Sequence, residues 1–178
     1  MKALIVYESM FGNTRTVAEA IAAGLRPDAD VTVVPVGEAS EDLLDAMDLV
    51  VVGGPTHVHG MSRASTRKSS GEQARQPGST VRLEPGTDGP GVRDWLAGLG
   101  SHSGPAAAFD TRMSGPAVLT GRASRGIAGR LRQHGLTLVD KPSSFLVTKK
   151  NVLQAGEEGR ARDWGSRLAA MADGTSRG

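Results

Sequence analysis

Cysteine is absent from this chain of 178 residues. Its absence excludes disulfides, thiolate catalysis and cysteine-ligated metals, and it makes a reducing cytoplasm the expected location. Aromatic residues are also scarce, at 3% of the sequence. Single-stranded nucleic acids are bound by stacking bases on several rings, so we expect no nucleic-acid partner.

Long apolar runs are missing as well. No stretch reaches the roughly 18 apolar residues that a membrane span needs. Met1 and Lys2 lead directly into an apolar strand pattern, without the charged segment, apolar segment and cleavage site of a secretory signal. We therefore expect neither a membrane span nor a signal peptide.

The chain has only a small excess of positive charge, with a formal net charge of +2. This excess lies in residues 62–90, which carry five basic and three acidic side chains, while the rest of the chain carries 16 of each sign. Fifteen of these 29 residues are Ser, Thr, Gly or Pro, which predicts a long inserted loop. Its basic side chains are expected to be solvated, or to meet an acidic redox partner or the phosphates of a larger ligand.

Strand and helix patterns alternate along the rest of the chain. Short apolar runs predict strands at 2–7, 31–36, 48–53, 105–109, 136–139 and 144–147, with a weaker one at 117–119. Periodic apolar faces predict helices at 13–25, after Ser40, at 91–99, at 123–134 and from Glu157 onward. Strands that are apolar throughout are buried on both faces, which predicts a three-layer α/β sandwich around a parallel sheet. We expect one domain over residues 1–173, with the insertion at 62–90 and a flexible tail at 174–178.

The bend after the first predicted strand concentrates hydrogen-bond donors. Ser9, Gly12, Asn13 and Thr14 lie between that strand and the N-terminus of the next helix, where backbone N–H groups are unpaired. Gly12 leaves room for an anion to approach the backbone. The bend therefore indicates a phosphate-binding nest, although an ordinary capped helix stays an alternative. It has no lysine and no G-x-G-x-x-G, so neither an ATP-hydrolysing P-loop nor a dinucleotide fingerprint is supported.

Two further loops are expected beside this bend. A Gly- and His-containing segment, 53–61, follows the third strand, and a segment at 109–117 follows the fourth. In a doubly wound sheet, ligands bind beyond the carboxyl ends of the strands, where the strand order reverses. The three loops together therefore predict a ligand crevice.

The stretches "YESMFGNTRTVAEAIA", "VVVGGPTH" and "FDTR" resemble the flavodoxin family over nearly the whole chain apart from the insertion. The resemblance implies a flavodoxin-like three-layer sandwich with a five-stranded parallel sheet in the order 2-1-3-4-5, and FMN as the cofactor. It also implies that Ser9, Gly12, Asn13 and Thr14 hold the FMN phosphate, with the isoalloxazine between residues 55–61 and 110–115. Phe11 stands where the family's phosphate loop has a hydroxyl, and the last two loops lack the usual stacking Trp and Tyr.

The predicted cofactor-binding residues come from these three segments. They are Ser9, Met10, Phe11, Gly12, Asn13, Thr14, Pro55, Thr56, His57, Val58, His59, Gly60, Asp110, Thr111, Arg112 and Met113. No protein nucleophile, catalytic base or complete metal-ligand set is predicted.

Several of these side chains have alternative interpretations. Asp110 either contacts the flavin or ribityl chain or caps its own loop. His57 and His59 are expected beside the flavin or in solvent rather than on a metal, because no third ligand is near. A cation at Arg112 would favour the anionic reduced flavin and raise its potential. Trp95 either packs in the core or reaches the ligand crevice.

Two functions from different classes fit these observations. The first is an FMN-binding redox protein, acting as an electron carrier or a small flavin reductase with a partner protein or a small-molecule electron donor or acceptor. The second is a flavin-free binding or regulatory module that keeps the fold and the phosphate nest, which Phe11 and the missing stacking rings favour. The oligomeric state, and whether the protein is an enzyme, stay undetermined by the sequence.

Overall fold

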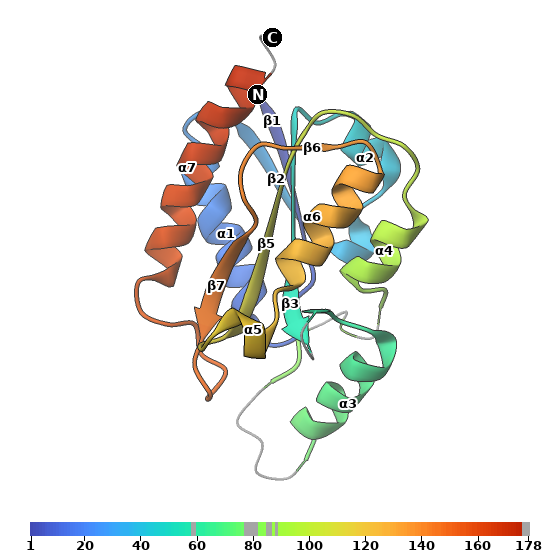
Figure 1. The fold of residues 1–178 in the computed structure, drawn as a ribbon, viewed down its shortest axis with the longest axis vertical. Helices are drawn as coiled ribbons and strands as arrows, with labels where there is room; N and C mark the ends of the chain where they lie inside the picture. Colours follow the sequence, from blue (N-terminus) through green and yellow to red (C-terminus); the bar gives the residue numbers. More distant parts are fainter. Residues whose placement is uncertain (58–59, 77–81, 85–86, 88, 176–178) are drawn as a thin grey trace.

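The computed structural model describes residues 1–57, 60–76, 82–84, 87 and 89–175, and Figure 1 shows their arrangement. Six strands form a parallel sheet. They are β1 (Lys2–Tyr7), β2 (Asp30–Pro35), β3 (Leu49–His57), β5 (Pro105–Met113), β6 (Thr137–Leu138) and β7 (Ser143–Val147). A two-residue strand, β4 (Gly60–Met61), pairs antiparallel with the end of β3.

The strand order is β2-β1-β3-β5, with β6 and β7 both paired to β5. This confirms the predicted order 2-1-3-4-5, with the fifth strand divided into two pieces. Lys141 and Pro142 lie between these pieces, and proline cannot donate a backbone hydrogen bond to a neighbouring strand. Among the described helices, none is long and apolar enough to cross a membrane.

Helices cover both faces of the sheet, as the sandwich prediction requires. One face carries α1 (Asn13–Leu25) and α7 (Glu157–Thr175), and the other carries the 3₁₀ turn η1 (Val36–Glu38), α2 (Glu41–Asp45), α4 (Val92–Gly98) and α6 (Ala123–Gln133) (Figure 1). Ser40 caps α2 by accepting a hydrogen bond from the backbone N–H of Leu43, as expected.

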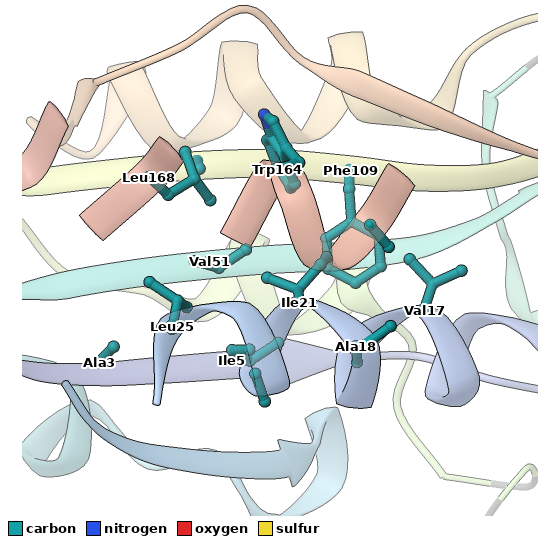
Figure 2. Close-up of a cluster of buried hydrophobic side chains, with 14 of the residues drawn as sticks. Ala3, Ile5, Val17, Ala18, Ile21, Leu25, Val51, Phe109, Trp164 and Leu168 are labelled. Atoms are coloured by element: carbon teal, nitrogen blue, oxygen red, sulfur yellow. The ribbon is translucent and has the colours of Figure 1, made fainter. Parts of the chain in front are cut away.

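The core beneath α1 and α7 combines aliphatic strand residues with an aromatic cluster. Figure 2 shows Ile5 and Val51 of the sheet facing Ile21 of α1 and Trp164 of α7. The rings of Phe109, Phe145 and Trp164 meet edge to face, with centroids 6.1 to 6.4 Å apart. Burial of these side chains holds α1 on the sheet, and α1 in turn positions the loop that precedes it.

Strand β5 is four residues longer than predicted. Residues 110–113 were expected in a loop, but they pair with β7 from Phe109 opposite Ser143 to Met113 opposite Val147. The polar residues Asp110, Thr111 and Arg112 ended the apolar run in the sequence, and only the neighbouring strand shows that the ladder continues. The predicted strand at 117–119 is wrong, because these residues lie in the short helix α5 (Ala117–Thr120).

The insertion at 62–90 is not a loop throughout. It contains α3 (Ala64–Ala74), which lies beyond the carboxyl end of the sheet in Figure 1. This helix lacks an apolar face, so its sequence gives no periodic signal. The predicted tail also begins too early, since α7 continues through Thr175; residues 176–178 lie outside the described ranges.

Candidate functional site

The first loop, residues 8–12, joins β1 to α1. Gly12 is the N-cap of α1 and has a φ of 92°, a left-handed conformation that favours glycine. Its N–H donates to Ser9 Oγ at 3.1 Å, and its carbonyl accepts the N–H of Thr16 at 2.9 Å. The loop therefore turns tightly into the helix, as the sequence predicts.

The N-terminus of α1 carries unpaired donors. The N–H groups of Asn13, Thr14 and Arg15 precede the first helical hydrogen bond, and none has an acceptor among the residues that the structure describes. Together with the partial positive charge at the helix end, these donors form an anion-binding position beside Gly12.

The side chains of Asn13 and Thr14, in contrast, are engaged within the protein. Asn13 Nδ2 donates to the carbonyl and the side-chain oxygen of Asn151, at 3.0 and 3.1 Å. The buried hydroxyl of Thr14 lies 2.8 Å from that of Thr111 on β5. These two residues tie the first loop to the neighbouring segments, a role that the sequence did not indicate.

A small cavity of about 100 Å³ brings the three predicted segments together. Its lining includes Met10, Phe11, Asn13, Thr14, Pro55, Thr56, His57, Thr111, Arg112 and Met113, with Val147 and Asn151 added from the C-terminal part of the chain. The last two were missed, because they approach the site only through the β5–β7 pairing and the turn that follows it. Val58 and His59 lie outside the described residues, and Gly60 pairs with His57 in β4.

A large cavity of about 560 Å³ lies on the other side of β1. It is lined by Tyr7, Glu8, Ser9, Met10, Arg15, Pro35, Val36, Gly37, Glu38, Arg67, Glu84, Thr87, Gly89 and Pro90. Ser9 therefore faces this space rather than the small cavity. No sequence pattern indicated the large cavity, because residues of the insertion form one of its walls.

His57 and Arg112 differ in how they face the small cavity. Burial lowers the pKa of His57, an effect that Glu8 opposes and Arg67 reinforces, so the imidazole is neutral near pH 7. Arg112 is largely buried, and its guanidinium donates to the carbonyl of Gly115 at 2.9 Å and to Thr120 Oγ1 at 2.8 Å. Arg112 thus fixes the segment around α5 while bringing positive charge to the cavity wall.

Asp110 does not face either cavity. It is fully buried, and its Oδ2 accepts the N–H of Ser124 at 2.7 Å, in the first turn of α6. Burial raises its pKa, and the hydrogen bond from the Ser124 backbone partly opposes that effect. The structure supports a capping role for Asp110, at α6 rather than in its own loop, and gives no support for the predicted cofactor contact.

Other polar groups near the site also have structural partners. Thr56 Oγ1 accepts the N–H of Ala123 at 2.9 Å, and Trp95 Nε1 donates to the carbonyl of Ala39 at 2.9 Å while its ring packs on the core. Trp95 therefore does not line the crevice. Within the described ranges, no three His, Asp or Glu side chains lie close enough to hold a metal ion.

The parallel sheet, its strand order and the donor-rich loop between β1 and α1 define a flavodoxin-like α/β protein. The sequence model described as Flavodoxin matches residues 5–115, which is more than half of the chain. The chain therefore belongs to the flavodoxin family, whose members bind flavin, typically FMN. No curated protein matches the chain.

Solved structures agree with this assignment at the level of the fold. A flavodoxin from the domain Archaea is 22% identical, with a TM-score of 0.65, over 97% of this chain and 99% of that one. Flavodoxin 1 from Bacillus cereus is 16% identical, with a TM-score of 0.65, over 96% and 98%. The Flv1 flavodiiron core from Synechocystis sp. PCC6803 is 15% identical, with a TM-score of 0.62, over 98% of this chain and 36% of that one.

Proposed function

We propose that this protein binds FMN and transfers electrons, either as a carrier or as a small FMN-dependent oxidoreductase. The observation that carries the proposal is a group of N–H donors, at Asn13, Thr14 and Arg15, that have no acceptor in the described part of the chain and lie next to a left-handed Gly12. The absence of cysteine is consistent with work in the cytoplasm. Bound FMN supplies the redox chemistry, and the protein supplies binding, orientation and electrostatic tuning.

The phosphate fits the first loop. Among the residues that the structure describes, and leaving aside the chain neighbours of Gly12, only the Glu84 carboxylate lies within 4 Å of a Cβ built on Gly12, so a glycine here leaves space beside the start of α1. The phosphate is held by these N–H groups and by the positive end of α1. Asn13 and Thr14 contribute through their backbone, because their side chains are bonded to Asn151 and Thr111.

The ring is proposed to lie between residues 55–57 and 111–113. Sites for ligands of this size have about 300–1,000 Å³, whereas the small cavity has about 100 Å³. Binding therefore requires the small cavity to widen, by movement of the wall residues His57 and Met113 away from each other. Met113 is 42% exposed, so its movement breaks few buried contacts. The neutral His57 and the positive Arg112 then set the environment of the ring, and Arg112 favours the reduced, anionic flavin.

An FMN titration followed by flavin fluorescence tests the proposal. Gly12→Ala adds a methyl group at the anion position and strains a left-handed residue by about 1–2 kcal/mol, so FMN affinity is expected to fall at least about tenfold. Gly129→Ala is the matched control and leaves affinity unchanged, because an added Cβ at this α6 glycine lies within 4 Å of no described atom outside its own turn of the helix. Thermal melts of both variants separate a binding defect from unfolding.

The flavin-free module is the second candidate function. The small volume between the predicted ring-binding segments and the internal bonds of Asn13 and Thr14 favour it. Colourless purified protein, with no fluorescence change in an excess of FMN, would support this candidate and contradict the first.

A further inference from the structure

A carboxylate from the insertion lies over the first loop. The backbone N–H of Glu84 donates to the carbonyl of Met10 at 2.9 Å, which anchors this part of the insertion to the loop. The Glu84 side chain is only 14% exposed, and its Oε1 lies 3.0 Å from a guanidinium nitrogen of Arg15. A Cβ built on Gly12 would lie 3.7 Å from the same Oε1. The Glu84 carboxylate therefore lies close to the anion-binding position.

The charges at this position are matched within the protein. The Glu84 carboxylate lies beside the positive N-terminal end of α1, where a negative group is favourable. It also pairs with Arg15, the basic side chain in the first turn of α1. Tyr7, on the same side of β1, has a raised pKa because of burial and, next in size, the negative charge of Glu84.

We propose that Glu84 is an internal competitor of the cofactor's phosphate, and that it sets the preference of this protein between phosphorylated and unphosphorylated flavins. The inference rests on the proposed function. A phosphate at Gly12 brings two further negative charges close to Glu84 and must displace the Glu84–Arg15 pair or share it. Riboflavin lacks the phosphate and meets neither cost.

Neutralising Glu84 is therefore expected to act on FMN alone. Glu84→Gln keeps the backbone bond to Met10 and the side-chain size, removes the repulsion and releases Arg15 to contact the phosphate. Two charges a few ångströms apart near a protein surface, partly screened by salt, correspond to about a tenfold gain in FMN affinity. Riboflavin affinity is expected to stay within about twofold, because riboflavin has no phosphate charge to interact with Glu84 or Arg15.

Glu72→Gln is the matched control. Glu72 lies in α3 of the same insertion and is exposed, so the substitution changes the net charge equally without touching the first loop. It is expected to change the affinity of either flavin by less than about twofold at physiological salt. Arg15→Gln gives a second test: it should weaken FMN binding more in the Glu84→Gln background than in the wild-type protein, because the arginine is released only there.

The outcomes separate this inference from the proposed function. If FMN binds but Glu84→Gln leaves the ratio of FMN to riboflavin affinity unchanged, or lowers it, the competitor role is overturned while the flavin function stands. If neither flavin binds, the flavin function fails. The competitor role is then tested by titrating the protein with inorganic phosphate and measuring the shifts of the amide NMR signals of Gly12 and Asn13. Glu84→Gln should then shift those signals at about tenfold lower phosphate concentration; equal titrations of both proteins would overturn the competitor role as well.

Discussion

The close approach of α1 and α7 makes Gly165→Ala a sharp test of the packing that positions the first loop. A Cβ at Gly165 would lie 2.2 Å from the backbone carbonyl oxygen of Ile21 on α1, whereas ordinary contacts begin at 3.4 Å. The obstacle is backbone, so no side-chain rotation relieves it, and the helices must separate locally by about the 1.2 Å difference.

The cost of that separation can be set against the gain from replacing glycine. Overpacking a core contact costs about 1–3 kcal/mol, and a backbone obstacle places the cost at the upper end. Alanine in place of glycine inside a helix raises the free energy of unfolding by about 1 kcal/mol, because alanine has the higher helix propensity. We expect a net loss of about 2 kcal/mol in the free energy of unfolding, and a fall in melting temperature of about 4–8 °C for a chain of this size.

Urea unfolding followed by far-UV circular dichroism measures the change, with Gly159→Ala as the control. Gly159 lies in the same helix, and outside its own turn no atom of the described residues lies within 4 Å of the added Cβ, so this variant is expected to gain up to about 1 kcal/mol. A Gly165→Ala protein as stable as the wild type, beside a stabilised Gly159→Ala protein, would show that α1 and α7 do not approach this closely.

Two more predictions concern buried charge. Arg67→Met removes a largely buried guanidinium that donates to Ser62 Oγ at 3.1 Å and to Asp94 at 2.8 Å. We expect the free energy that holds α3 on the domain to fall by about 2 kcal/mol, and proteolysis within α3 to become faster. Arg63→Met, at an exposed residue, should show neither effect. The pKa of Asp110 is raised above 3.8 in the folded protein. Its contribution to stability is therefore fully present below the unfolded pKa and is lost as pH rises through the folded pKa. Asp110→Asn, which keeps the acceptor for Ser124, should flatten this decline in urea unfolding measured from pH 4 upward; an unchanged slope would refute the assignment.

The sequence by itself determined the local elements and the position of the first loop. Apolar runs and helical periodicity depend only on residues close in sequence. Strand β1, the start of β3 at Leu49 and helix α1 from Asn13 were therefore predictable. The tight bend around Gly12 was predictable for the same reason, and the structure adds that Gly12 has the left-handed conformation that glycine adopts without steric cost.

The tertiary structure alone decided which polar groups meet. Asn13 is bonded to Asn151, 138 residues away, and Thr14 to Thr111, 97 residues away, so no local pattern could show that these donors are engaged. The continuation of β5 through Met113 depends on its pairing with β7, and the polar α3 is held by Arg67 rather than by an apolar face. The position of Glu84 over Gly12 has the same origin. Contacts between distant segments follow from how the whole chain packs, so the residues around either partner do not reveal them in the sequence.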